Sequence, residues 1–579
     1  MRILKWIPLL YSILIFGQED SILQIDPKIE ADSLWYKNSQ NNFSSSDEFI
    51  LLGYHDFESS IMGNFGSVLI PFWWKSGSSV EQKIGDRILE ANTLYPGYTS
   101  VYKENFPHTK IIYSPTYSDG QRLNFIHKVK YTYGSFIIDY DRLVSEGNLV
   151  HEKHQNTRFN FQGSYTHPKI AYTSKWRINT FKNSSLWNGG IGNESTFFSN
   201  SQSNWQLLPV NWLNLETSIK HKGLDWQHEY RFSEASVFKY QINISQDSLF
   251  YEGLEDDTLF YPNRLDSSTT LTRAFSNINH TLKWIKQINK DKNAVVGLKN
   301  QNFKQDQESL NRWIFFTSIY SESLKNQVHF SYASDQMYSN SFTANFTQHI
   351  NVFGINNRFK IAYEKTMPNW IQLNSSIEPS NQFYEELIEP TLDQYIEWDL
   401  ELTKNITIHN AYHNIDAFTY YNEQAHSVTS DHLIRIIQSR IKHHVNSKKW
   451  HWRGDIGYQN SSSDNIPLAK LLFNQRIYWQ SKIFKDATET QIGINARYRS
   501  SHPGMTYSPI LGDFYTNPLS ETNASLKCDV FAHFKIQSIK IYASYENFNA
   551  LWQGEQFTLK PYPIAQPIFR LSLIWNFYD

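Results

Sequence analysis

The chain has 579 residues, of which 16% are aromatic and only 19% are charged, against roughly 25% charged residues in typical soluble domains. Its 54 basic and 56 acidic residues leave a net charge of −2, so the basic excess that nucleic acid requires is missing. The single cysteine, Cys528, excludes intramolecular disulfides and multi-thiolate metal sites. The many aromatic residues exclude a disordered chain.

The first 17 residues predict a cleaved secretory signal peptide. Arg2 and Lys5 precede an apolar run from Ile7 to Phe16, and Gly17 supplies a small residue before a polar stretch. The apolar run is shorter than the ~20 residues that a membrane-spanning helix needs. Since no later segment holds a long apolar run, the mature chain is either soluble after export or crosses a membrane as a closed barrel.

Residues 18–110 differ from the rest of the chain. The stretch 21–46 is polar, and a Gly-rich turn at residues 62–67 is followed by Pro71-Phe-Trp-Trp74. The sequence leaves three alternatives open for this segment: a periplasmic leader, a plug inside a barrel lumen, or the first hairpins.

Alternation of apolar and polar residues with a period of two predicts strands along residues 111–579. In the segment 224–232, Leu224, Trp226 and Tyr230 fall on one face of a strand, and the charged residues fall on the other. The same division recurs in segments 159–165, 170–178, 238–245, 278–284, 396–403 and 569–577. These lengths approach the 9–11 residues, roughly, of a tilted membrane-crossing strand. We therefore expect an all-β transmembrane antiparallel up-and-down barrel of roughly 16–24 strands, with long extracellular loops.

Turns and loops agree with this interpretation. Tyr133-Gly-Ser135 predicts a short periplasmic turn, and the polar stretches 182–204, 246–268 and 287–307 predict long extracellular loops.

The alternation also assigns side chains to the two faces of the barrel wall. The candidate lumen-facing residues are Lys175, Arg177, Asp225, Glu229, Arg231, Lys239, Glu397, Asp399 and Glu401. The candidate lipid-facing residues are Trp176, Trp226, Tyr230, Trp284, Trp398, Trp575 and Phe577. The three acidic residues at 397–401 share one strand face. They predict either a cation-attracting ladder or, as we prefer, carboxylates paired with basic residues such as Lys175, Arg177 or Lys239 on other strands.

Catalytic and cofactor motifs are missing from the sequence. His151-Glu-Lys-His154 is one residue short of the HExxH motif, and a spacing of three on a strand sends the two histidines to opposite faces. We expect no enzyme activity, no cofactor and no metal site.

The sequence resembles the putative porin family of Bacteroidota outer membranes. The resemblance is carried by Met62-Gly-Asn-Phe-Gly-Ser67, by the run 106–172, which includes Tyr117-Ser-Asp-Gly-Gln121 and Tyr140-Asp-Arg-Leu-Val-Ser-Glu-Gly147, and by the closing stretches 545–549, 562–563 and 569–579. It implies an outer-membrane barrel with a transport role. One departure is Asp579, which follows the terminal aromatics Phe577 and Tyr578.

The sequence thus predicts a porin-like channel in a bacterial outer membrane that passes small hydrophilic solutes by passive diffusion through a polar lumen. Its expected partners are outer-membrane lipid, the barrel-assembly machinery, which would recognise the C-terminal strand, and the solutes themselves. Two alternatives remain: a plugged surface barrel whose extracellular loops bind a ligand or partner, and a secreted soluble β-rich binding protein.

Overall fold

The computed structural model describes residues 57–77, 80–81, 83–84, 107–116, 120–193, 205–254, 270–305, 308–321, 325–335, 340–373, 389–553 and 556–578. The predicted signal peptide, residues 1–17, and the polar stretch 21–46 lie outside this part of the chain. No helix in the described part is long and apolar enough to cross a membrane.

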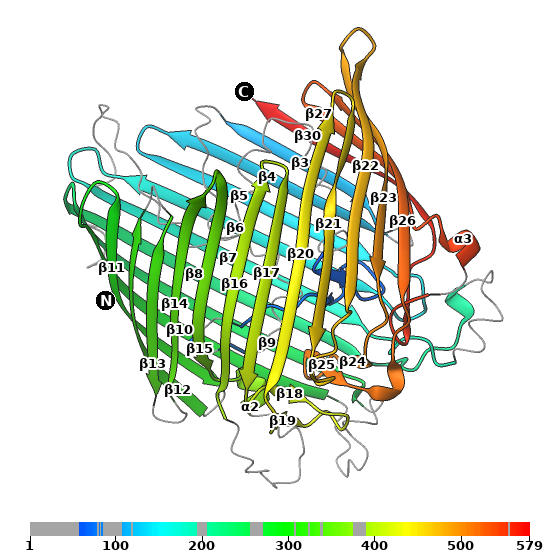
Figure 1. The fold of residues 1–579 in the computed structure, drawn as a ribbon, viewed down its shortest axis with the longest axis horizontal. Coiled ribbons are helices and arrows are strands. Elements are labelled where there is room, and N and C mark those ends of the chain that lie inside the picture. Colours follow the sequence, from blue (N-terminus) through cyan, green and yellow to red (C-terminus); the bar gives the residue numbers. More distant parts are fainter. Residues whose placement is uncertain are drawn as a thin grey trace, which may run out of the picture.

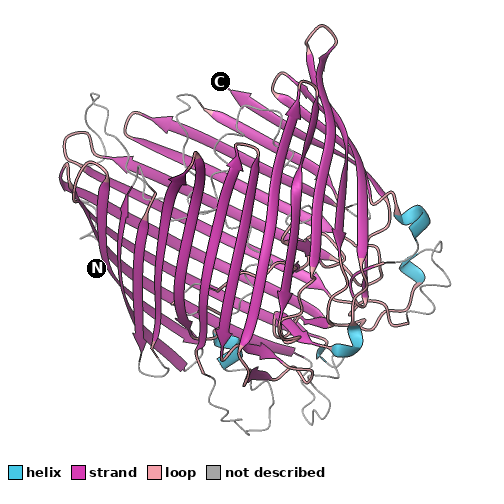
Figure 2. Cartoon of the chain, viewed as in Figure 1, coloured by secondary structure: helices cyan, strands magenta, loops and turns pink. Residues whose placement is uncertain are grey.

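Twenty-two antiparallel strands close into one barrel (Figures 1 and 2). The first eleven are β3 (His108–Pro115), β4 (Gln121–Tyr131), β5 (Gly134–Ser145), β6 (His154–Thr166), β7 (Tyr172–Leu186), β8 (Glu216–Ser233), β9 (Ser236–Glu252), β10 (Thr270–Gln287), β11 (Lys292–Gln305), β12 (Glu308–Ser321) and β13 (Gln327–Asp335). The others are β14 (Ser341–Val352), β15 (Ile355–Thr366), β16 (Thr391–Thr403), β17 (Ile406–Asp416), β20 (Ile434–Ser447), β21 (Trp450–Ser461), β22 (Leu471–Ile483), β23 (Thr488–Arg499), β26 (Ser525–Ile536), β27 (Ile539–Glu546) and β30 (Ile568–Tyr578). The predicted fold class is confirmed, and the strand number falls within the expected range.

Smaller elements lie outside the barrel wall. They are the hairpin β1 (Ser59–Ile61) and β2 (Leu69–Pro71), the loop strands β18 (Thr419–Tyr421), β19 (Ser427–Thr429), β24 (Met505–Ser508), β25 (Asp513–Thr516), β28 (Phe557–Leu559) and β29 (Tyr562–Pro563), and the short helices η5 (Trp205–Leu207), α2 (Trp370–Leu373), η7 (Pro518–Ser520) and α3 (Ala550–Gln553).

The barrel closes where the first and last wall strands meet. β30 pairs with β3 from His108↔Tyr578 to Tyr113↔Leu573 and, on its other side, with β27 from Ile539↔Trp575 to Glu546↔Ile568. Closure satisfies the backbone groups of both strands, which an open sheet would expose at its edges.

The two ends of the barrel differ in their connections. At the end that holds His108 and Tyr578, which we call the turn end, consecutive strands are joined by tight turns such as Val352-Phe-Gly-Ile355. Phe353 and Gly354 both have positive φ, 51° and 81°, as a two-residue hairpin turn requires. The opposite end, the loop end, carries longer connections, including residues 187–215, 367–390 and 500–524.

Several strands are longer than the sequence alternation indicated. β10 and β8 each contain 18 residues, or roughly 59 Å at the usual rise. The predicted loop at 287–307 is therefore wrong, because residues 292–305 form β11. On the outer face of β11, Val296 and Leu298 give way to Asn300, Asn302 and Lys304 toward the loop end. The outer face is polar there and the inner face includes the buried Phe303, so the alternation of an apolar outer face with a polar inner face disappears although the strand continues.

Candidate functional site

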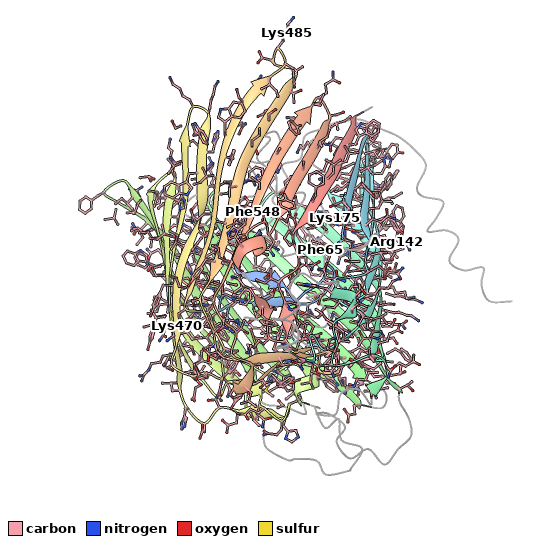
Figure 3. The ribbon with its side chains drawn as sticks, turned by 90° about the vertical axis from the view of Figure 1, so that its right-hand side faces the viewer. Phe65, Arg142, Lys175, Lys470, Lys485 and Phe548 are labelled. Carbon is pink, nitrogen blue, oxygen red and sulfur yellow. The ribbon has the colours of Figure 1, made fainter. Side chains whose placement is uncertain are left out.

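The described residues between 57 and 84, namely 57–77, 80–81 and 83–84, lie inside the barrel toward its loop end, and we call them the insert (Figure 1). Its residues Phe57, Met62 and Phe72 are at most 5% exposed and pack in one hydrophobic cluster with wall residues including Leu249 and Leu472. Phe65, which lies within the outline of the barrel in Figure 3, is also buried. The cluster also contains Tyr507 from the loop strands. The insert and the inward-folded loops therefore occupy the loop end of the lumen.

Asn64 fastens the insert to the connection between β5 and β6. Its Nδ2 donates to the carbonyl oxygens of Ser145, at 3.1 Å, and Glu152, at 2.6 Å, and the Ser145 hydroxyl donates to its Oδ1. The Glu152 carboxylate accepts the N–H groups of Asn148 and Leu149 at 2.9 and 3.1 Å. Burial raises the pKa of Glu152 to about 7, although these N–H groups favour the charged form.

Glu58 fastens the insert to the opposite part of the wall. Its carboxylate pairs with Lys75 of the insert and with Arg440 of β20, whose Nη1 lies 2.5 Å away. Burial alone would raise the pKa of Glu58, but the two cations outweigh burial and bring it down to about 2. The Arg440 guanidinium also stacks 4.1 Å over Phe57 and donates to Asp455 of β21.

Two glutamines of the wall hold the insert's backbone. Gln459, which is fully buried, donates to the carbonyl of Phe72 and accepts the N–H of Trp74 at 3.2 Å. Gln438 donates both to the carbonyl of Trp74, at 3.2 Å, and to the side-chain oxygen of Gln459, at 3.0 Å. Backbone polar groups that would otherwise lack partners inside the lumen are satisfied in this way.

Further contacts tie the insert to other strands. Ser76 donates to Glu364 of β15 at 3.0 Å, and Glu81 pairs with Lys299 of β11 at 2.6 Å. Near α2, the N–H of Trp370 donates to the carbonyl of Lys83 at 2.8 Å. The insert thus reaches wall strands on several sides of the lumen.

These contacts identify the inner face of each strand, because side chains alternate across a sheet. Lys299, which contacts the insert, sets the inner face of β11. The strand registers carry this assignment across β10, β9, β8 and β7. Glu364 does the same for β15 and β16. All nine residues predicted to line the lumen lie on this inner face: Lys175, Arg177, Asp225, Glu229, Arg231, Lys239, Glu397, Asp399 and Glu401.

The charged residues of the inner face are paired across neighbouring strands. Arg177 pairs with Asp225, and Lys239 pairs with Glu229 at 2.9 Å. The acidic residues of β16 pair with β15 and β17: Asp399 lies 2.8 Å from Arg358 and 2.5 Å from His409, and Glu397 lies 3.6 Å from both Arg358 and Lys360. Compensation of the acidic ladder was expected, but its partners are the adjacent Arg358 and Lys360 rather than Lys175, Arg177 or Lys239.

The residues predicted to face lipid lie on the outer face. Trp226, Tyr230, Trp284, Trp398 and Trp575 are between 39% and 48% exposed. Trp176 and Phe577 are half-buried on the same face. Asp225, the neighbour of Trp226 on the inner face, is only 3% exposed. The wall therefore separates an exposed apolar face from a charged face that neighbouring residues bury.

Sequence reasoning missed wall residues that hold the insert, among them Gln438, Arg440, Gln459 and Arg499, whose guanidinium lies over the Phe72 ring. On β20 the inner residues Ile434, Ile436, Gln438 and Arg440 are themselves mixed in polarity, so the alternation was hidden. The signal that pointed to the insert was the aromatic run Phe72-Trp-Trp74 in a segment without strand periodicity.

His151, Glu152 and His154 are not arranged for metal binding. His151 has a positive φ of 57° in the β5–β6 connection, and His154 makes an edge-on contact with Trp187, with ring centroids 5.0 Å apart. In the described part of the chain, no group of three or more His, Cys, Asp or Glu residues could hold a metal ion.

Similar folds occur among outer-membrane transporters of known structure. The ferric enterobactin receptor PfeA from Pseudomonas aeruginosa is 10% identical, with 83% of this chain and 81% of that chain covered and a TM-score of 0.61. The FrpB iron transporter from Neisseria meningitidis is 8% identical, with 82% of each chain covered and a TM-score of 0.60. The copper transporter OprC is 9% identical, with 90% of this chain and 94% of that chain covered and a TM-score of 0.63. At these identities the likeness shows the fold alone.

No curated protein sequence matches the chain. A family model described as a putative porin matches residues 38–579, which include the insert and the whole barrel. The chain therefore belongs to the putative porin family and is an outer-membrane β-barrel channel.

Proposed function

We propose that this protein passes small hydrophilic solutes across the outer membrane by diffusion, and that the insert limits their passage at the loop end. The observation that carries the proposal is a closed barrel with a charged, internally paired inner face and a polar-tethered segment across one end of its lumen. A polar inner wall favours water and hydrophilic solutes over apolar ones.

The proposed orientation places the loop end outside the cell and the turn end in the periplasm. It is supported by the contrast in connection length, because outer-membrane barrels have short periplasmic turns and longer extracellular loops. The exposed Trp, Tyr and Phe residues of the outer face would contact lipid, and the charged inner face would enclose the solute path. Cleavage after residue 17 would precede insertion, and the resemblance noted in the sequence favours a Bacteroidota outer membrane.

A second candidate is a plugged barrel whose loops bind a ligand that displaces the insert. It is favoured by the extent of the insert's attachment, since Asn64, Glu58 and the Phe72–Trp74 backbone are each held by buried wall groups. Conductance distinguishes the two candidates, because a plugged barrel conducts only after the insert is displaced.

Planar-bilayer conductance and liposome swelling would test both candidates. The full-length protein is compared with a variant that lacks residues 57–77 and with the milder variant Asn64→Ala. We expect measurable single-channel steps for the wild type and larger steps for both variants. A silent wild type with conducting variants would favour the plugged barrel. If all three proteins fold, as judged by heat-modifiable electrophoretic mobility, and none conducts, the transport proposal is overturned.

A further inference from the structure

A cavity of about 80 Å³ lies between the insert and the barrel wall. The insert contributes Phe57, Ser59, Ser60 and Phe72 to its lining, and the wall strands β22, β23 and β26 contribute Asn474, Arg497, Arg499 and Lys527. Three of the described lining residues are cationic and none is acidic. Hydroxyl and amide groups complete the polar part of the lining.

Arg499 is the group that makes this cavity unusual. Its side chain is 5% exposed, and its guanidinium stacks 4.4 Å over the Phe72 ring. Two of its nitrogens donate to the carbonyl oxygens of Thr558 and Phe557 at 2.5 and 2.9 Å. Its Nε is buried without a hydrogen-bond partner, and no described carboxylate forms an ion pair with it. A buried guanidinium held by neutral groups retains an uncompensated positive charge.

In the described part of the chain, the carboxylates that act on Lys527 are Asp529 and Glu546, and both pair with other cations. Asp529 pairs with Arg497 at 2.5 Å, and Glu546 binds Arg570 through two hydrogen bonds of 2.9 Å. Among the described residues, Asp529 and Glu546 are therefore engaged by Arg497 and Arg570, and neither forms an ion pair with Arg499.

We propose that this cavity binds a small oxyanion, a phosphate or carboxylate group, between the Arg499 guanidinium and the Lys527 ammonium. Guanidinium and ammonium groups are the usual partners of such anions, and their hydrogen bonds to charged oxygens are about twice as strong as neutral ones. The cavity has room for several water molecules, which matches a small anion and is too little for a large organic ligand. The role of this anion site in transport rests on the proposed function. If that function holds, the site indicates that small oxyanions are a class of solute that the channel carries.

The row of cations continues from the cavity toward the turn end. Arg476 follows Asn474 by two residues on β22, or about 7 Å along the strand, and it pairs in register with Arg453 of β21. Arg476 also stacks 4.2 Å over Phe531. A bound anion would therefore meet further positive groups along the inner wall, as expected for a path that carries anions.

Calorimetric titration of the detergent-purified, full-length protein with inorganic phosphate and with acetate tests the site directly. We expect saturable binding of at least one of these anions and no binding of glucose. Arg499→Gln should weaken the binding at least tenfold, since it removes a charge and its fork of donors. Lys527→Gln should weaken it as well and serves as a second variant if Arg499→Gln does not fold.

Lys535→Gln is the matched control, because it removes the same charge from the same face of β26, roughly 26 Å farther along the strand. Unchanged binding in this variant is expected. The inference is overturned if neither anion binds, or if Lys535→Gln weakens binding as much as Arg499→Gln does. Since the titration requires no conduction, a conducting protein that binds no anion refutes only the inference. If the protein binds phosphate but neither the wild type nor the two conductance variants conducts, only the transport proposal is refuted.

Discussion

Glu152 occupies the connection between β5 and β6, where its carbonyl holds Asn64 and its carboxylate holds two backbone N–H groups. Its pKa is raised to about 7 from an ordinary value of 4.5. The state in which Asn64 attaches the insert to this connection, here called the attached state, therefore holds a proton on Glu152 more tightly than a detached state in which water reaches Glu152. Between about pH 4.5 and pH 7 the attached state binds more protons than the detached state, so the stability of the attached state falls as the pH rises through that window.

The free energy that favours the attached state over the detached state is predicted to fall by about 3 kcal/mol across this window. Hydrogen exchange of residues 57–77, corrected for intrinsic rates, should show a correspondingly easier opening at pH 8 than at pH 5. Glu152→Gln should remove most of this pH dependence, because the amide does not titrate. An equal pH dependence in Glu152→Gln would show that another group is responsible.

At the scale of single strands, the outer face of β10 indicates where the membrane boundary lies. On its outer face Ile278, Leu282 and Trp284 are apolar, whereas Thr272 lies nearer the loop end. In a Cys528→Ser background, Thr272→Cys should react with a membrane-impermeant maleimide on intact cells, and Leu282→Cys should not, because lipid covers it. Reaction at Leu282→Cys, or its absence at Thr272→Cys in protein confirmed to be at the surface, would contradict the proposed orientation and band.

The same strand shows what the sequence could predict. The segment 278–284 was identified from its alternation because its outer residues Ile278, Leu282 and Trp284 are apolar, as the proposed contact with lipid requires. Residues 270–277 of β10 and all of β11, residues 292–305, were not identified, and their outer faces include polar residues such as Thr272, Asn300 and Lys304. Alternation therefore marks the part of a strand whose outer face is apolar rather than the whole strand.

At the scale of the whole molecule, closure of the wall could be anticipated, but the position of the insert could not. Strand faces follow from local periodicity. The insert is instead held by residues far away in sequence, such as Gln459 for Phe72, a separation of 387 residues, and Arg440 for Glu58. Such contacts depend on which strands the barrel brings around the lumen, and periodicity carries no information about that. The cavity beside Arg499 is hidden from sequence reasoning for the same reason.

Closure of the barrel depends on its last strand. β30, the 11 residues Ile568–Tyr578, pairs with both β27 and β3. Removing it leaves two strand edges whose backbone groups would meet lipid unpaired, at a cost of several kcal/mol for each group. A variant ending at Gln566 should therefore fail to give a heat-modifiable band and should not accumulate in the outer membrane.

Deletion of residues 375–387 is the matched control, because it removes the same number of residues as the truncation after Gln566 from the connection between β15 and β16, outside the described strands. This variant should still fold and insert. If the chain without β30 gave a stable, heat-modifiable barrel in the membrane, the remaining strands would have to close on one another. The pairing of β3 with β30 would then not be what holds the barrel shut.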